Sequence, residues 1–322
     1  MGRNTNLIIL GLIFLIILLP AFPINEVFSQ KNPQKIGSSI SEIGEESVSY
    51  DVYVLLTHVG KIDRKVGEYE LDFWLALTTS DGDFTKEKPK IDFVNGNIDK
   101  LSHELIQPNY YEAFVQGTFF NEMDFHDFPF EKLAMTIEIE PSAPGTVDKV
   151  ILNVDPDSGI DSAAKILGWI VSDVNFEVRT HTYDETEEFY RYVALFTLEH
   201  SAIRSFFNTF FPAMVFLGVS LISFWVPKNF SSRIYLTMLP LVSLTFWHSY
   251  ILNTIPTVGY LTIFDKVMIP VYVLFVNGVL SVGIQMRLDH LQKPQLVEKT
   301  NKIMRALIPI LGVGIFLAMW NL

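Results

Sequence analysis

The apolar stretch YLTMLPLVSLTFWHSYIL, residues 235–252, carries an unusual number of side chains that can hydrogen-bond or titrate. They are Thr237, Ser243, Thr245, His248 and Ser249, and the stretch also contains Pro240. Polar groups of a membrane helix avoid lipid and face other helices or a water-filled path. The stretch therefore predicts contact with water or ions along one side of a helix. His248 either hydrogen-bonds a neighbouring helix or senses protons.

A second set of candidate residues lies in TYDETEEFYRY, residues 182–192, where aromatic and acidic side chains alternate. The aromatic residues are Tyr183, Phe189, Tyr190 and Tyr192, and the acids are Asp184, Glu185, Glu187 and Glu188. Aromatic faces and carboxylates suit an organic cation, and carboxylates alone suit a divalent ion. The same charge run is also typical of a solvated hairpin tip, so all three interpretations stay open.

No arrangement of residues indicates catalysis. His126 lies beside Asp124 and Asp127, but this resembles a ligand cluster only superficially, and serine-hydrolase, glycine-rich and metalloprotease signatures are absent. The chain has no cysteine, which excludes disulfides and thiolate metal sites. We therefore predict that the protein is not an enzyme and uses neither a cofactor nor a bound metal.

Composition divides the chain into two parts. The 322 residues are 49% hydrophobic with a mean hydropathy of +0.28, and the apolar residues are unevenly distributed. Residues 30–200 hold 32 acidic against 14 basic residues, a net charge of −18, whereas the rest of the chain is slightly basic. This pattern predicts an acidic domain outside the membrane joined to a membrane region, and it excludes nucleic acid as a partner.

The first 47 residues are predicted to precede the folded part. Residues 1–29 contain the short apolar run LIILGLIFLIILL bounded by Arg3 and Pro20, as in a signal peptide, with an uncleaved anchor as the alternative. Residues 30–47 are polar and low in aromatic residues, which indicates a flexible lead.

Residues 48–203 predict an all-β antiparallel sandwich. VSYDVYVLL and YELDFWLAL alternate apolar and polar residues and flank the turn-like VGKIDRKVG, so they form a hairpin. Five more strand-like runs follow between clusters of Pro, Gly, Asn and Asp.

Residues 204–322 predict four membrane helices, at about 206–226, 234–255, 264–286 and 303–321. The loops after the first and third helices are basic and face the cytoplasm by the positive-inside rule. The prediction is a multi-pass plasma-membrane protein whose N-terminal domain and C-terminus are extracellular.

Two segments resemble the pentameric ligand-gated ion channels, in particular prokaryotic members without cysteines. MDFHDFPFEKLAMTIEI, residues 123–139, is similar to the family's signature loop and the strand after it. SSRIYLTMLPLVSLTFWHSYILNTIPTVGYLTIFDKVMIP, residues 231–270, is similar to the second membrane helix, the outer loop and the start of the third helix. The order of elements agrees over nearly the whole chain, although the extracellular domain is shorter. The resemblance implies a homopentamer.

The resemblance also implies which side of the second membrane helix lines a pore. The stripe is Ser232, Tyr235, Leu239, Val242, Phe246, Ser249 and Asn253. Its middle is apolar, so a ring of Leu239, Val242 and Phe246 is expected to gate by dewetting. A helical wheel favours a different face, formed by Thr237, Thr245, His248 and Ser249, and a kink at Pro240 loosens either assignment.

The resemblance further implies a coupling zone between the two domains. Its expected members are Asp63, Glu131, Pro129, His200 and Arg204. His200 stands where relatives have an arginine, with Arg204 one helical turn later, so either a titratable histidine or the displaced arginine serves the junction.

Partners and selectivity follow from the same evidence. We expect self-association into a homopentamer, passage of inorganic ions, contact with membrane lipid, and a small-molecule or proton agonist. Ser232 replaces the glutamate that cation-selective relatives carry, so the acidic domain alone predicts a weak cation preference. The competing hypotheses are a non-conducting, membrane-anchored oligomeric binding protein and a small transporter; the transporter is disfavoured because no ionisable residue other than His248 lies mid-helix.

Overall fold

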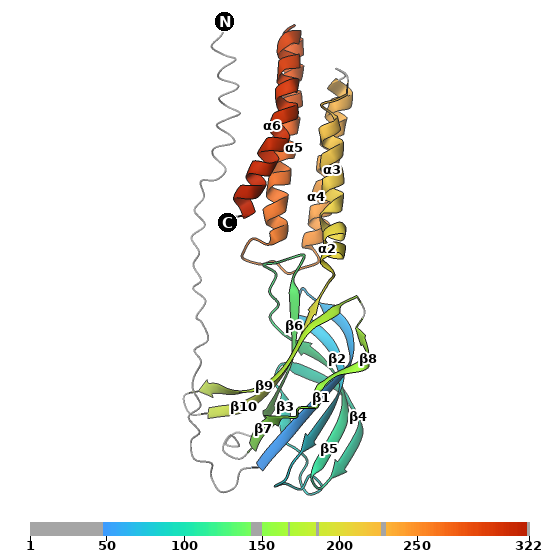
Figure 1. The fold of residues 1–322 in the computed structure, drawn as a ribbon, viewed down its shortest axis with the longest axis vertical. Coiled ribbons are helices and arrows are strands. Elements are labelled where there is room, and N and C mark those ends of the chain that lie inside the picture. Colours follow the sequence, from blue (N-terminus) through green and yellow to red (C-terminus); the bar gives the residue numbers. More distant parts are fainter. Residues whose placement is uncertain (1–47, 143–149, 167, 185–186, 227–229, 321–322) are drawn as a thin grey trace. The chain divides into compact units, whose positions relative to one another are not determined.

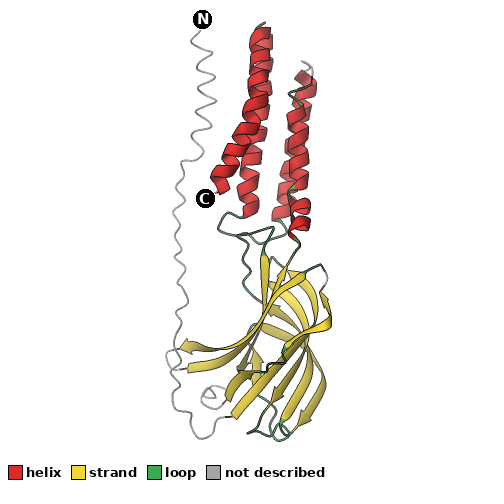
Figure 2. Ribbon diagram, in the orientation of Figure 1, coloured by secondary structure: helices red, strands yellow, loops and turns green. Residues whose placement is uncertain are grey.

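The computed structural model describes residues 48–142, 150–166, 168–184, 187–226 and 230–320, all within the compact unit Gly44–Leu322. Strands occupy the described residues up to Glu199 and helices begin at Ala202 (Figures 1 and 2). The predicted signal peptide, residues 1–29, and flexible lead, residues 30–47, lie outside the described residues.

The first sheet has six strands. Its order is β4 (Gly96–Gln107), β5 (Tyr110–Phe120), β2 (Glu68–Thr78), β1 (Val48–Asp63) and β7 (Val150–Val154), and β8 (Gly159–Ile166) also pairs with β1. The pairs among β4, β5, β2 and β1 are antiparallel, but β7 and β8 run parallel to β1. The prediction of a wholly antiparallel sandwich is therefore wrong at this edge. In the chain β7 follows β6 of the other sheet, so no hairpin joins β7 to β1. Only a hairpin would force these two strands to be antiparallel.

The second sheet is antiparallel and packs on the first. Its order is β3 (Ile91–Phe93), β6 (Lys132–Pro141), β10 (Glu187–Glu199) and β9 (Ile170–Asp184). Alternate residues of both sheets, such as Leu71 and Phe73 of β2 and Met135 and Ile137 of β6, lie in one hydrophobic core. The buried hydroxyl of Tyr69 donates to the carbonyl of Thr136 across the core, at 2.9 Å.

The first hairpin is longer than predicted. Strand β1 continues to Asp63 through two irregularities, at Leu56/His58 and at Val59/Ile62, so the turn begins only at Arg64. Bulges accommodate the polar residues that interrupt the alternation of apolar and polar residues in the sequence. Strands β3, β4 and β8 had no predicted counterpart. In β4 both faces are largely exposed, as befits an edge strand, and this removes the alternation on which the prediction depends.

Five helices follow: α2 (Ala202–Thr209), α3 (Phe211–Ile222), α4 (Phe230–Leu252), α5 (Ile263–His290) and α6 (Pro294–Trp320). Among the described residues, Ser232–Leu252 and Ile263–His290 are each long and apolar enough to span a membrane. The chain is therefore a membrane protein by these two helices. Helices α2 and α3 are long and apolar enough for a third span when taken together, but they bend by 43° at the break between them.

The prediction of four continuous spans is not met. The first predicted span, 206–226, breaks near Pro212, which has no N–H to donate to the preceding turn, and α3 ends at Ile222. The fourth, 303–321, corresponds to α6, which is not among the spans found in the described residues. Helix α6 starts well before the predicted span, with the charged residues Glu298, Lys299, Lys302 and Arg305 in its first turns.

Candidate functional site

Much of α4 is left uncovered by the rest of the described chain, including Met238 and Tyr250 as well as the predicted stripe. Tyr235, Leu239, Val242 and Phe246 are 64%, 62%, 49% and 74% exposed, although all four are large apolar residues. Ser249 and Asn253 continue the exposed line, and the amide of Asn253 donates to the Ser249 carbonyl at 2.8 Å. Ser232, at the other end, is half-buried. Except at Ser232, the stripe implied by the resemblance coincides with a side of α4 that has no partner within the described chain.

The competing face of α4 is largely packed inside the described chain, although the buried Nε2 atom of His248 has no hydrogen-bond partner there. Thr237 is 1% exposed, and its hydroxyl donates to the carbonyl oxygens of Arg233 and Ile234. His248 lies 3.0 Å from the Tyr272 hydroxyl of α5 and stacks on that ring. Thr245 is exposed, but its hydroxyl bonds to its own helix. Two of the three residues that distinguish this face therefore pack within the helices.

The loop that precedes β6 contacts the start of α5. The N–H groups of Ile263 and Phe264 donate to the carbonyl oxygens of His126 and Phe128, at 3.1 and 3.0 Å. The first amides of a helix have no partner within it, so the loop supplies acceptors that α5 lacks. Thr262 and Asp265 complete this helix start as a capping box.

Aromatic contacts reinforce the same junction. The ring of Phe264 is fully buried and packs against Phe128 of the loop, Phe210 between α2 and α3, and His248 of α4. The ring of His126 stacks on Tyr260, with centroids 3.6 Å apart and planes 5° apart. These contacts join the loop to α4, to α5 and to the break between α2 and α3.

Glu131 is the buried charge of this junction, and its partner is Arg64. The carboxylate is 2% exposed and its Oε1 lies 2.8 Å from Nη1 of Arg64, in the turn after β1. The guanidinium also lies 5.9 Å from the ring of Phe128. The Oε2 atom of Glu131 has no hydrogen-bond partner among the described residues. Asp63, predicted to act here, pairs instead with Lys61 and accepts from the N–H of Lys65.

His200 and Arg204 do not bond to Glu131. The His200 ring stacks on Trp169, and its Nδ1 lies 2.8 Å from the carbonyl of Gly168. Burial lowers the pKa of His200, although this hydrogen bond and the charge of Glu131 oppose the shift. Arg204 is exposed on α2. The sequence prediction thus missed Arg64: the resemblance directed attention to the strand end at His200, whereas the cation comes from the residue after Asp63. Pro129 is buried in the loop, as a structural member of the junction.

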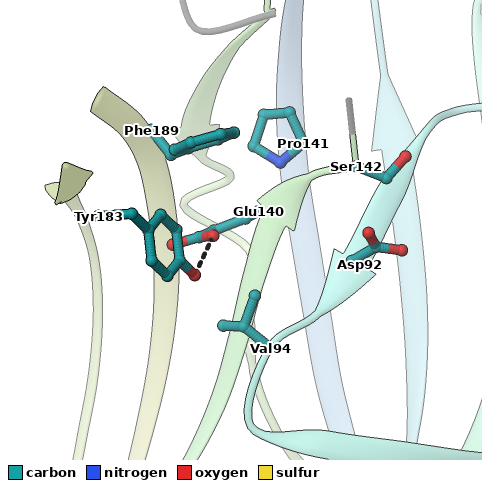
Figure 3. A pocket seen from close by; sticks show the side chains of 7 residues that line it. All are labelled: Asp92, Val94, Glu140, Pro141, Ser142, Tyr183 and Phe189. Carbon is teal, nitrogen blue, oxygen red and sulfur yellow. Dashed lines mark hydrogen bonds between the residues drawn. The ribbon is translucent and has the colours of Figure 1, made fainter. Parts of the chain in front are cut away.

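A pocket of about 210 Å³ opens on the β3–β6–β10–β9 sheet (Figure 3). Its lining residues are Asp92, Val94, Glu140, Pro141, Ser142, Tyr183 and Phe189. The Tyr183 hydroxyl donates to Glu140 at 2.8 Å, and Arg191 binds both Glu140, at 2.6 Å, and Glu138, at 2.8 Å. Burial and the neighbouring Glu140 raise the pKa of the Tyr183 phenol.

The pocket contains only part of the predicted ligand site. Tyr183 and Phe189 line it, whereas Tyr190 packs partly against the core. The prediction for Tyr192 is wrong, because its ring is fully buried: along β10 it falls on the inward-facing side. The backbone of Glu187 pairs with Asp184, and its side chain lies outside the described part of the chain. Asp92 and Glu140 were not predicted, since they come from other strands. Arg191 lies on β10 among the predicted residues, but nothing in the local sequence marks it as the partner of Glu140.

The described residues contain no cluster of three or more His, Asp or Glu side chains arranged to hold a metal ion. No protein-family model matches this chain, and no curated protein is significantly similar to it.

Proposed function

We propose that the chain is one subunit of a homopentameric ligand-gated ion channel of the plasma membrane. In this proposal α4 lines the pore, the β-sandwich senses the agonist, and the loop before β6 transmits the signal. The third and fourth spans are the bent pair α2 and α3 and the apolar part of α6. The N-terminal domain and the C-terminus are extracellular, in keeping with the basic residues that follow α3 and α5.

The observation that carries the proposal is the exposed stripe of α4. Tyr235, Leu239, Val242 and Phe246 find no cover in a subunit that buries other groups of the same helix. Copies of the subunit arranged around an axis would direct this stripe toward a common lumen. The large apolar side chains at Leu239, Val242 and Phe246 would then keep the closed lumen dry.

Coupling is proposed to run through the loop that precedes β6 and contacts the start of α5. An agonist bound at the edge of the β3–β6–β10–β9 sheet acts on the sheet that contains β6, and β6 begins directly after Glu131. The pair of Glu131 with Arg64 joins that point to the first hairpin, and the loop carbonyls hold α5. The contacts at Phe264 bring the same movement to α4 through His248.

The proposed agonist site is the pocket between Asp92 and Tyr183. Arg191 pairs with Glu140 and also with Glu138. Asp92 is the lining carboxylate that has no partner among the described residues. A carboxylate beside the rings of Tyr183 and Phe189 favours a small organic cation over a divalent ion, which requires several oxygen ligands.

Weak cation preference is proposed to come from the acidic domain. The net charge of −18 over residues 30–200 is repeated in each subunit. Carboxylates also gather around Tyr53 on the first sheet. Burial raises the pKa of Tyr53, and the nearby negative charges of Asp155, Asp157, Glu112 and Asp161 raise it further. Arg233 is buried and therefore adds no positive ring to the exposed stripe.

The proposal is tested by the mass of the purified protein in mild detergent together with ion flux into liposomes. A mass of five subunits and agonist-dependent flux support it. Five subunits without flux under any agonist would favour the non-conducting binding protein, and a monomer or dimer would refute the channel.

A further inference from the structure

The turn between β3 and β4 joins the two sheets of the sandwich, and the side-chain amide of Asn95 holds this turn in place. Its Oδ1 accepts a hydrogen bond from the N–H of Glu138 at 2.9 Å. Its Nδ2 donates to the carbonyl oxygens of Phe120, at 3.1 Å, and of Thr136, at 3.0 Å, and it lies 3.0 Å from the Thr136 hydroxyl. One amide therefore ties the end of β5 in the first sheet to β6 in the second.

Glycine is required at the position after Asn95. A Cβ atom on Gly96 would overlap the ring of Phe119. That ring is fully buried and packs against the rings of Tyr69 and Phe93, so it has no room to move aside. Core packing therefore imposes the dipeptide Asn95–Gly96 on this turn.

An asparagine followed by glycine is open to deamidation. The backbone nitrogen of the glycine attacks the side-chain Cγ of the asparagine, because no Cβ hinders its approach. A C–N bond forms, the bond between Cγ and Nδ2 breaks, and ammonia leaves with the proton of the glycine amide. Water then opens the cyclic imide at either of its carbonyl carbons, which gives aspartate or isoaspartate. The other Asn–Gly pair of the chain, Asn277 and Gly278, lies inside α5, where the helix fixes the backbone.

The folded sandwich opposes this reaction at Asn95. The attack brings Cγ within bonding distance of the Gly96 nitrogen, which requires movement of the side chain and of the backbone between them. Hydrogen bonds to β5 and β6 restrain the side chain. The pairing of Gly96 with Phe119 in the β4–β5 ladder restrains the backbone. The reaction therefore has to wait until the turn opens.

We propose that Asn95 is a deamidation site that the folded sandwich protects, and that its conversion makes an opening of the β3–β4 turn irreversible. The carboxylate oxygen that replaces Nδ2 would face the carbonyl oxygens of Phe120 and Thr136 without a proton to share. The carboxylate of Glu138 lies 3.5 Å from the Thr136 hydroxyl, so the new negative charge would also meet an existing one. Isoaspartate would in addition lengthen the main chain beside the tightly packed Gly96. The proposal concerns the β-sandwich alone and does not require the protein to conduct ions.

The test compares deamidation at residue 95 in the folded and the unfolded full-length protein. Both samples are kept at the same mildly alkaline pH, one in mild detergent and one in denaturant, and are then digested and analysed by mass spectrometry. The peptide that contains Asn95 should deamidate at least about tenfold more slowly in detergent, because the reaction there requires local opening of the turn. Equal rates in the two samples, or no reaction at Asn95 in denaturant, would overturn the proposal.

Two variants measure the effect of the new carboxylate. Asn95→Asp should lower the unfolding temperature in detergent by about 5 °C or prevent folding, because the amide that ties β5 to β6 is lost. Asn97→Asp is the matched control: it adds the same charge on β4, but Asn97 is exposed and its side chain makes no hydrogen bond among the described residues. It should fold and unfold as the wild type does. Equal stability of the two variants would refute the proposed effect.

Refolding shows whether the change is irreversible. Wild-type protein that is partly deamidated in denaturant and then returned to detergent should give a folded fraction enriched in intact Asn95. The same proportion of deamidated protein in the folded and the aggregated fractions would mean that the sandwich tolerates the change, and the proposal would be wrong.

Discussion

Replacing Arg64 with alanine should destabilise the protein, because it leaves the buried Glu131 carboxylate without its cation. The Glu131 side chain is 1% exposed, and its second oxygen already lacks a hydrogen-bond partner among the described residues. Removing one member of a buried ion pair typically costs about 3–5 kcal/mol. Arg64 is itself 23% exposed, so solvent screening lowers our expectation to about 2–3 kcal/mol. For a domain of this size that is a fall in unfolding temperature of roughly 5–10 °C.

A second substitution tests the direction of the stability change, whatever its size. Glu131→Gln removes the enclosed charge and leaves a side chain of the same shape. The double variant R64A/E131Q should therefore unfold at a higher temperature than R64A alone. Lys61→Ala is the matched control, because Lys61 pairs with Asp63 at the surface of the same hairpin and should matter by less than about 1 kcal/mol.

The assay is thermal unfolding of the full-length protein in detergent, followed by intrinsic fluorescence. Two results would refute the reasoning: an Arg64→Ala variant as stable as Lys61→Ala, or a double variant less stable than R64A. Either would mean that Glu131 is not held as a buried carboxylate by Arg64.

Three further predictions concern the pore, the junction and the pocket. Val242→Ser and Phe246→Ser should each raise the resting conductance in bilayer recordings, because a polar ring lowers the cost of wetting the constriction; unchanged currents would favour the other face of α4. Burial lowers the pKa of His200 below its ordinary 6.5, so the unfolded chain binds the proton more readily than the folded one. The free energy of unfolding should therefore fall as the pH drops through 6.5 and level off above it. His200→Gln should flatten this pH profile in thermal unfolding. Asp92→Asn should weaken activation by small organic amines about tenfold in concentration–response curves, whereas Tyr183→Phe, which keeps the ring, should weaken it less.

The strands of the core could be predicted because burial on one face enforces alternation. Strands β1, β2, β5, β6 and β10 carry this pattern and lie close to where it indicated. Edge strand β4 could not be predicted in this way, since it has no buried face to record in the sequence. Hydropathy located the helices but not the break near Pro212, because both sides of the break are apolar.

The candidate site was predictable where it depends on one element and obscure where it combines several. The α4 stripe was named from the resemblance, because the polar pattern of the helix alone favours the other face. The pairing of Arg64 with Glu131 joins positions that are 67 residues apart, and nothing in either local sequence indicates the other. Tyr192 was misassigned because composition marks a strand as aromatic without saying which side of the sheet each ring occupies.

The central claim is that α4 lines an ion-conducting pore, and single-channel recording from the purified protein in a planar bilayer tests it most directly. Under a KCl gradient, the account predicts agonist-dependent unitary currents with a weak cation preference that declines as salt screens the acidic domain. Silence under every agonist and with Val242→Ser would contradict the claim. Currents that select anions, or cations strongly at every salt concentration, would show that the acidic domain does not sort the ions.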